Sequence, residues 1–316
     1  MQHEIEFFNV PIAIRALKYA SVYKLKNDKG TFLIDAGMGA EGTDFLEKAG
    51  VDFSSIDAIL LTHLHIDHLG GGLVAGERYG IPLYIGKKDL DLINMIQGNL
   101  EKYADHDENV LRVNGVPDPS SFAFRKENPV FARMDDYEKL SLMDLDKISS
   151  DKTGIKTFDV PGHSPGSTCF IPEGTDKIFT GDHILEKITP NISYYDADSD
   201  LLGMYLQSLE NTSVLNVDMA YPGHGAPFRN VKERIEGIIL HHRHRMEEIL
   251  HILAEGKSTA YDVSRKMKWS RDRKLDSMND MERKFAFGEA ISHLRHMEAT
   301  GMCSVNEKNG VMYYSK

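Results

Sequence analysis

Cysteine and long hydrophobic runs are scarce in this sequence. Its 316 residues include only two cysteines, Cys169 and Cys303, which disfavours a zinc site closed by thiolates and a scaffold held by disulfides. No apolar run approaches the roughly 20 residues that a membrane-spanning helix needs. The amino terminus, Met-Gln-His-Glu, lacks the basic and then apolar pattern of a secretory leader. These absences predict a reduced, soluble, cytoplasmic protein with no membrane partner.

Positive charge is also in deficit. Lys and Arg total 37 against 48 Asp and Glu, which gives a net charge of −11 and a pI near 5.7. This balance disfavours a broad phosphate-binding surface and therefore nucleic acid as the main partner. An apolar content of 41% in a chain of this length predicts a sizeable core, enough for one large domain and a small one.

Metal-ligand side chains, by contrast, are dense in residues 62–72, which read Thr-His-Leu-His-Ile-Asp-His-Leu-Gly-Gly-Gly. The apolar run before them, residues 56–61, predicts a buried strand that ends where the ligands begin. The three glycines after them predict a sharp turn before a helix. Because side chains alternate along an extended strand end, the first two histidines face one ion, and the next carboxylate and imidazole face a second. These four side chains are His63, His65, Asp67 and His68.

Three later turns place a further ligand directly after a glycine at the end of an apolar run. They read Pro161-Gly162-His163, Thr180-Gly181-Asp182 and Tyr221-Pro222-Gly223-His224. Small neighbours allow close approach at such turns. Together with the early cluster they predict His63, His65 and His163 around one ion, Asp67, His68 and His224 around the other, and Asp182 between the two. Asp35, at the end of another predicted strand, is either a turn acid or a buried group that braces the metal loop.

The remaining pattern divides the chain into two predicted domains, residues 1–230 and 231–316. In the first, we predict strands at 4–8, 21–26, 31–35, 82–86, 154–160, 168–171 and 177–180, and helices at 43–49 and 73–79. Residues 87–150 form a charged insertion that either covers the site or is a plain surface elaboration. The second domain has predicted helices at 229–255, 258–267 and 282–300 and a hairpin around Asn309-Gly310, an order that suggests a winged helix.

The run His-x-His-x-Asp-His, followed by separate His, Asp and His positions, resembles the metallo-β-lactamase superfamily over about residues 1–230. The resemblance implies an α/β fold, a four-layer αβ/βα sandwich with a two-metal site along one edge. Asp182 stands where true lactamases place a cysteine, and His65 where flavodiiron proteins carry a glutamate, so the glyoxalase II branch is the more similar one. The tail lacks the basic residues with which glyoxalase II holds glutathione, and is similar instead to lactamase-like hydrolases that act on RNA.

We therefore predict a binuclear metal-dependent hydrolase in which a metal-bridging hydroxide attacks a carbonyl ester, thioester or lactone of a small molecule. Asp67 and Asp182 are the predicted catalytic carboxylates. The main alternative is an endoribonuclease or phosphodiesterase that uses the same site while the carboxyl-terminal domain contacts RNA. A non-enzymatic metal-binding protein is a third interpretation, which seven ligands for two ions disfavour.

The nitrogen and oxygen ligands suit two divalent ions, with zinc as the first expectation and iron or manganese compatible. Substrate contacts are expected in the loop that leaves Asp182, because that loop starts beside the metals. The tail is also a candidate surface for a homodimer. The predicted substrate contacts are His183, Lys187, Asn191 and Tyr194.

Overall fold

The structure is a computed structural model that describes residues 3–13, 17–121, 142–195 and 199–316. Its first sheet is antiparallel from β1 to β3 and parallel from β3 to β6. In the turn between β2 and β3, the Asn27 side chain accepts hydrogen bonds from the backbone N–H groups of Lys29 and Gly30. In spatial order the strands are β1 (Glu4–Pro11), β2 (Tyr19–Asn27), β3 (Gly30–Ile34), β4 (Ala58–Leu60), β5 (Leu83–Ile85) and β6 (Leu142–Asp144).

The second sheet has four strands. The pairs β7–β8 and β8–β9 are antiparallel, whereas β9 and β10 run parallel. All the strands predicted in residues 154–180 are confirmed, with ends that differ by at most one residue. In spatial order the strands are β10 (Met219–Pro222), β9 (Lys177–Gly181), β8 (Thr168–Pro172) and β7 (Ile155–Asp159).

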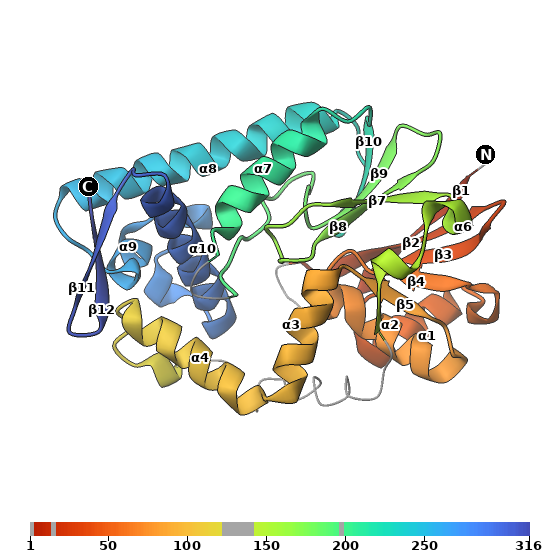
Figure 1. The fold of residues 1–316 in the computed structure, drawn as a ribbon, viewed down its shortest axis with the longest axis horizontal. Coiled ribbons are helices and arrows are strands. Elements are labelled where there is room, and N and C mark those ends of the chain that lie inside the picture. Colours follow the sequence, from red (N-terminus) through yellow and green to blue (C-terminus); the bar gives the residue numbers. More distant parts are fainter. Residues whose placement is uncertain (1–2, 14–16, 122–141, 196–198) are drawn as a thin grey trace.

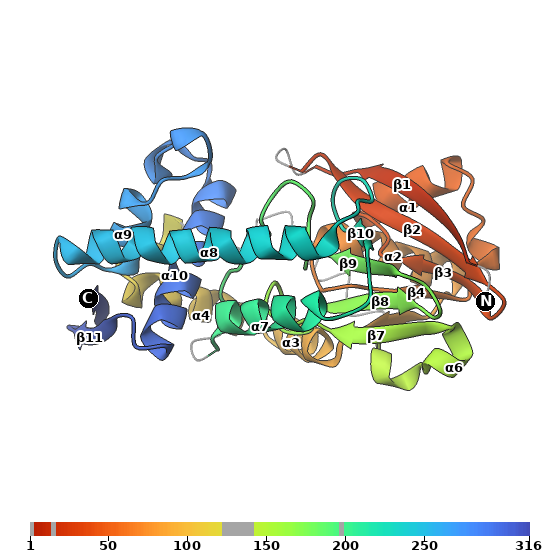
Figure 2. The same ribbon diagram turned by 90° about the horizontal axis from the view of Figure 1, so that it is seen from above.

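Helices cover the outer face of each sheet (Figures 1 and 2). Tyr23 and Phe32 of the first sheet pack with Phe170 and Phe179 of the second in one buried cluster, so the two sheets face each other. Other clusters join the first sheet to α1 and α2 and the second sheet to α7 and α8. The predicted αβ/βα sandwich is confirmed. These helices are α1 (Gly39–Lys48), α2 (Ile66–Tyr79), α7 (Leu201–Ser213) and α8 (Val231–Ala254).

Helix α2 corrects one expectation. It begins at Ile66, so Asp67 and His68 lie in its first turn, and the three glycines lie inside the helix rather than in a sharp turn. These glycines allow α2 to pack closely against the backbone that follows β3. A Cβ on Gly71 would collide with the backbone oxygen of Ala36, and one on Gly70 would crowd the backbone nitrogen of Gly39.

The predicted insertion contains more regular structure than its sequence indicates. Helix α3 contributes Ile93 to the core beneath the first sheet, and β6 extends that sheet. Helix α4 instead contributes Val110 and Leu111 to a cluster with the carboxyl-terminal helices. Residues 122–141 of this segment lie outside the described residues. Its described elements are α3 (Lys87–Gly98), α4 (Leu100–Val113), η2 (Pro119–Ser121), β6, η4 (Leu145–Lys147) and the first residue of α6 (Ser150–Thr153).

The carboxyl-terminal elements follow the predicted order. Capping boxes fix the starts of α9 and α10, with Thr259 and Asn279 as the N-caps. Ser258 pairs with Tyr314 of the terminal hairpin through an isolated bridge. No helix in the described part of the chain is long and apolar enough to cross a bilayer. After α8 the elements are α9 (Ala260–Lys266), η5 (Ser270–Asp272), η6 (Leu275–Ser277), α10 (Asp280–Ala299), β11 (Ser304–Lys308) and β12 (Val311–Ser315).

Candidate metal centre

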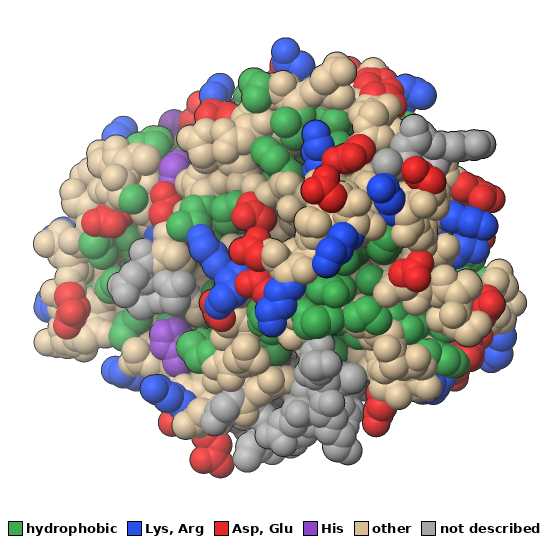
Figure 3. Space-filling model, turned by 45° about the vertical axis from the view of Figure 1, so that its right-hand side comes forward, with side chains coloured by type: hydrophobic (Ala, Val, Ile, Leu, Met, Phe, Trp, Pro, Cys, Tyr) green, Lys and Arg blue, Asp and Glu red, His purple; other side chains and the backbone are tan. Residues whose placement is uncertain are grey.

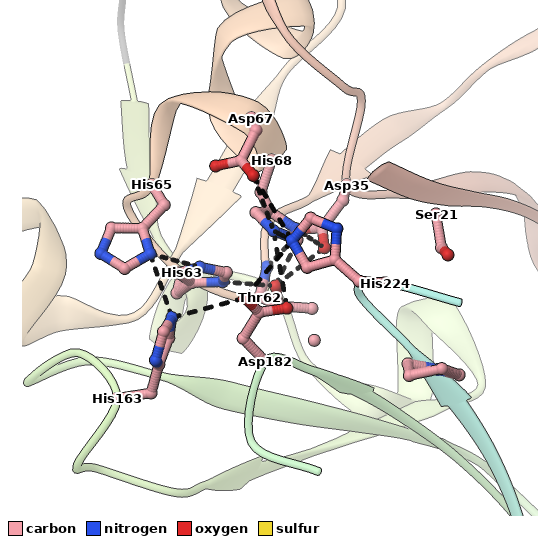
Figure 4. A network of polar contacts seen from close by, with 12 residues as sticks. Ser21, Asp35, Thr62, His63, His65, Asp67, His68, His163, Asp182 and His224 are labelled. Atoms are coloured by element: carbon pink, nitrogen blue, oxygen red, sulfur yellow. Dashed lines mark hydrogen bonds and ion pairs between the residues drawn. The ribbon is translucent and has the colours of Figure 1, made fainter. Parts of the chain in front are cut away.

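The predicted ligands come from different places in the chain and converge at one edge of the sandwich (Figure 4). Segments that follow β4, β9 and β10 carry His63, Asp182 and His224, while His163 lies in the turn between β7 and β8. Strands β4, β9 and β10 are short and contain no exposed residue, so their ends are fixed by sheet pairing and core packing. The polar side chains therefore gather where the strands stop.

Three imidazoles form the first group. The Nδ1 atom of His65 lies 3.0 Å from Nε2 of His63 and 3.0 Å from Nε2 of His163. Burial lowers the pKa of all three imidazoles, that of His65 to about 3. They are therefore neutral at pH 7, and neutral imidazole is the form that binds a metal.

The second group combines imidazoles with carboxylates. Nε2 of His68 lies 3.3 Å from Nε2 of His224, and Oδ2 of Asp67 lies 3.4 Å from the same His224 atom. Asp182 lies between the groups, with one oxygen 3.6 Å from His163 Nε2 and 3.4 Å from His224 Nε2, and the other 3.6 Å from His68 Nε2. The arrangement offers two adjacent positions for a cation with a shared carboxylate.

Each imidazole turns its other nitrogen to a protein partner. These outward hydrogen bonds fix both the ring orientation and the tautomer, which is how metal-binding histidines are held. The hydroxyl of Thr62 donates to Asp35, so it is an acceptor for His63. The outward bonds run from His63 Nδ1 to Thr62 Oγ1 (3.0 Å), His65 Nε2 to Tyr195 Oη (2.7 Å), His68 Nδ1 to Asp35 Oδ2 (2.8 Å), His163 Nδ1 to the Asn191 carbonyl (2.9 Å) and His224 Nδ1 to the Tyr19 carbonyl (2.7 Å).

In the second group a cation would replace protons, because, against the effect of burial, the Asp182 carboxylate raises the pKa of His68 and raises that of His224 to about 11. Burial raises the pKa of a carboxyl group, yet the imidazoles of His224 and His68 hold the pKa of Asp182 well below its usual range and lower that of Asp67 to about 2. Both carboxylates are therefore ionised. Oδ1 of Asp182 is buried without a hydrogen-bond partner, and a Cβ on Gly223 would collide with it. A buried, charged oxygen of this kind is what a bound cation satisfies. Among the described residues, the three groups of side chains able to hold an ion are His63–His65–His163, His63–His68–Asp182 and Asp67–His68–His224.

The structure places Asp35 directly behind the ligands. It is buried at 2% exposure, and its carboxylate accepts hydrogen bonds from the Thr62 backbone N–H (2.8 Å) and from His68 Nδ1 (2.8 Å). Its φ of 58° lies in the left-handed region, which is uncommon for a residue other than glycine. Such strain persists where the surroundings fix the backbone, often near a functional site. The geometry is that of a brace rather than of a turn acid.

Two residues that hold the ligands have no signal in the sequence. Asp89 in α3 is fully buried and accepts hydrogen bonds from the Leu64 N–H (2.9 Å), the Ser164 hydroxyl (2.6 Å) and the Gly166 N–H (2.6 Å). It thereby joins the loop of the first histidines to the loop of His163. An acid in the first turn of a helix is commonplace, so position alone does not distinguish Asp89. Tyr195, the second, follows the predicted Tyr194.

The four predicted substrate contacts have varied environments. His183 is buried and pairs with Thr212 Oγ1 at 3.0 Å. The Tyr194 hydroxyl donates to Asp107 at 2.9 Å, away from the ligands. Asn191 contacts His163 through its carbonyl, while its side chain donates to the backbone of α10. Only Lys187 has a largely exposed side chain, at 83%.

Comparisons with known proteins agree with this geometry. A family model of the metallo-beta-lactamase superfamily matches residues 16–224. The chain is 25% identical over 236 residues to an atrochrysone carboxyl ACP thioesterase of Aspergillus fumigatus, and the match covers 74% of this chain and 59% of the relative. It is 24% identical over 308 residues to a probable metallo-hydrolase of Bacillus subtilis, covering 93% of this chain and 92% of that one. The chain spans only 59–62% of the length of three fungal relatives that it matches.

A solved structure extends the likeness to the whole fold. The crystal structure of a metallo-beta-lactamase family protein from Thermus thermophilus has a TM-score of 0.79 with 24% identity, and the match covers 99% of this chain and 98% of that one. The common fold therefore includes the carboxyl-terminal helices. Since the family model covers more than half of the sequence and its match ends on the candidate ligand His224, this chain belongs to the metallo-beta-lactamase superfamily.

Proposed function

We propose that this protein is a hydrolase of the glyoxalase II-like branch that uses two divalent metal ions on a carbonyl ester, thioester or lactone of a small molecule. One observation carries the proposal: five imidazoles and two carboxylates direct their free atoms at one another, while the outward nitrogens of the imidazoles are all occupied. A structural zinc site closes one ion with four ligands. This larger set with a central carboxylate suits a catalytic pair of ions.

The chain's own groups have separable roles in hydrolysis. When bound, two divalent ions supply a water of lowered pKa and a Lewis acid for the carbonyl oxygen. Asp67, ionised and 6% exposed, accepts a hydrogen bond from the attacking water and so orients it. Asp182 lies centrally and keeps the two groups of imidazoles in register. The products are a carboxylic acid and an alcohol or thiol, so no side-chain nucleophile is needed.

Three observations support an acyl substrate over a phosphodiester polymer. A related protein carries the name of an acyl carrier protein thioesterase. On the face drawn in Figure 3, Lys and Arg side chains are interspersed with Asp and Glu rather than gathered in one basic surface. Three basic residues of the tail are neutralised by acids, because Arg273 pairs with Glu282, Arg283 with Asp280, and Lys284 with Asp107. Polyanion binding requires unpaired positive charge.

We further propose that residues 231–316 form a winged-helix-like unit. Helices α8, α9 and α10 are followed by the β11–β12 hairpin, and Tyr314 of that hairpin pairs with Ser258, just before α9.

We also propose zinc as the ion. The donor atoms are nitrogen and oxygen with no thiolate, a set that suits zinc and is compatible with iron or manganese. Neither proposal is needed for the hydrolysis itself.

The test is an assay of purified protein on small thioesters, lactones and bis(p-nitrophenyl) phosphate, before and after metal removal. We expect thioester or lactone turnover that is lost on chelation and restored by zinc, and two metal equivalents per chain by elemental analysis. The Asp182→Ala variant is expected to lose at least about 100-fold in turnover. Activity that survives complete metal removal would contradict the proposal, and so would turnover of the phosphodiester alone.

A further inference from the structure

The two groups of candidate ligands are held by different parts of the chain. Partners of the second group come from the amino-terminal sheet: Asp35 follows β3 and orients His68, and the Tyr19 carbonyl in β2 orients His224. Partners of the first group include a segment without helix or strand, residues 191–195, which we name the 191–195 segment. Asp35 touches both groups, because it also accepts from the Thr62 hydroxyl that pairs with His63, whereas the 191–195 segment contacts imidazoles of the first group alone.

The 191–195 segment contacts two of the three imidazoles of the first group. The Asn191 carbonyl accepts from His163 Nδ1 at 2.9 Å. Tyr195 Oη lies 2.7 Å from His65 Nε2 and donates to the His163 carbonyl at 3.4 Å. Displacement of this segment would release His65 and His163 from their orientations while leaving the partners of His68 and His224 in place.

Helix α10 fixes the segment at three points. The Asn191 amide donates to the Phe285 carbonyl (3.1 Å) and approaches Glu289 Oε2 (3.5 Å). The Ser292 hydroxyl donates to the Ser193 carbonyl at 2.7 Å. At Gly288 the helix touches the segment so closely that a Cβ would collide with Ser193 Oγ.

A second carboxyl-terminal helix secures this arrangement. Arg245 of α8 donates from Nε to Glu289 Oε1 at 3.1 Å, and its guanidinium stacks over Trp269 at 4.5 Å. Arg245 is only 9% exposed. Glu289 is therefore held in place, and the amide of Asn191 meets a fixed partner rather than a mobile surface carboxylate.

We propose that α10 is part of the scaffold of the metal centre and that, through the 191–195 segment, it sets the affinity of the first ion site, His63–His65–His163, but not that of the second. Asn191, Gly288 and Ser292 are thus positioning residues. This inference rests on the proposed binding of two metal ions. It gives the carboxyl-terminal helices a role in the metal centre itself, in addition to their contribution to the core.

The experiment compares zinc binding by the full-length chain and four variants, by competition with a chromophoric chelator that resolves the two binding steps. His163→Ala identifies the step that belongs to the first site. Gly288→Ala places a methyl group of α10 against Ser193 of the 191–195 segment. Asn191→Ala removes the contacts of the Asn191 amide with α10. Gly237→Ala is the matched control, because Gly237 is an exposed glycine of α8 and a Cβ there meets only open space near Arg234.

We expect Gly288→Ala and Asn191→Ala to weaken the first-site step by about 10- to 100-fold, the usual effect of losing a group that orients a metal ligand. The second step and the Gly237→Ala control should match the wild type, and the thermal midpoint of the metal-free protein should change little for Asn191→Ala. If both variants keep wild-type constants, or lose both steps equally, the inference is overturned. A wild-type protein that binds fewer than two ions would overturn the proposed function instead.

Discussion

Asp89 illustrates how a single side chain stabilises two loops that carry ligands. Its carboxylate is inaccessible to solvent and accepts three hydrogen bonds, from Leu64, Ser164 and Gly166. Burial raises its pKa to about 6, although those three donors oppose the shift. At neutral pH the carboxylate is therefore mostly ionised. Loss of the side chain removes the acceptor of two backbone N–H groups and a hydroxyl.

We expect Asp89→Ala to lower the free energy of unfolding by about 2–4 kcal/mol, because buried donors are left without this partner. The measurement is urea unfolding of the metal-free protein at pH 7. Asp91→Ala is the matched control: it lies in the same helix, its side chain is 56% exposed and it pairs with Lys87 at the surface, so its loss should cost less than about 1 kcal/mol. Equal effects of the two substitutions would show that Asp89 does not brace the loops.

The sequence predicts the ligand types and, in Asp35, one candidate support, but it does not predict the other supports. Histidine and aspartate directly after a buried strand are informative, because four metal-ligand residues within six positions are hard to explain by packing or by a surface loop. Tyr195 and Asp89 are ordinary residues by type and position, and only the path of the backbone decides their contacts. Proximity to Asp182 in the sequence favours Tyr194, yet Tyr194 donates to Asp107 while its neighbour Tyr195 contacts His65.

Helix α2 carries two of the candidate ligands and depends on glycines for its position. Gly71 lies where a Cβ would collide with the Ala36 backbone oxygen, and its N–H donates to the Gly37 carbonyl at 2.8 Å. The helix can therefore approach the turn after β3, which places Asp67 and His68 beside Asp35. Glycine lowers intrinsic helix stability, so packing rather than propensity explains its presence here.

We expect the same substitution to have opposite effects in two helices. Gly71→Ala should destabilise the protein by about 1–3 kcal/mol through overpacking against rigid backbone, and should weaken metal binding because His68 moves with the helix. Gly237→Ala in α8 should be neutral or stabilising by up to about 1 kcal/mol, since alanine favours helix and the Cβ meets open space. Thermal unfolding with and without zinc measures both effects. A Gly71→Ala protein as stable as the wild type would refute this account of the glycines.

At the level of elements, the predicted strands and carboxyl-terminal helices form, whereas α7 and β6 were not predicted. The expected strands and the capping of α9 by Thr259 rest on local pattern, which the structure retains. The start of α2 departs from its pattern, because three glycines in a row normally break a helix and only tertiary contact explains them. The insertion departs from it too, since the apolar residues of α3 and α4 are buried in two different cores.

Across the whole molecule, the insertion and the carboxyl-terminal region share one core. Val110 and Leu111 of α4 pack with Leu253 of α8 and Leu294 of α10, and Figure 1 shows α4 beside α10. A division of the sequence at residue 230 does not reveal this, because the contacts join residues more than 100 positions apart. Helix α8 also runs from the second sheet to the carboxyl-terminal helices (Figure 2). The chain should therefore unfold with strong coupling between its regions.

The pair formed by Lys284 and Asp107 tests that coupling. Lys284 of α10 is 8% exposed, its Nζ lies 2.6 Å from Asp107 of α4, and Asp107 also accepts from Tyr194. Burial lowers the pKa of Lys284 to about 8, so the amine is mostly charged at pH 7. Replacing it with methionine removes this amine from beside a buried carboxylate, which we expect to cost about 3–5 kcal/mol.

Arg265→Ala provides the comparison, because Arg265 pairs with Asp276 at a surface where both side chains are more than half exposed, and such pairs contribute about 1 kcal/mol or less. Urea unfolding followed by circular dichroism at pH 7 measures both variants. If the regions are coupled as their shared core implies, Lys284→Met shifts one common transition to lower urea. A variant in which only the carboxyl-terminal helices unfold early, while the sheets keep the wild-type midpoint, would show instead that the two cores are energetically independent.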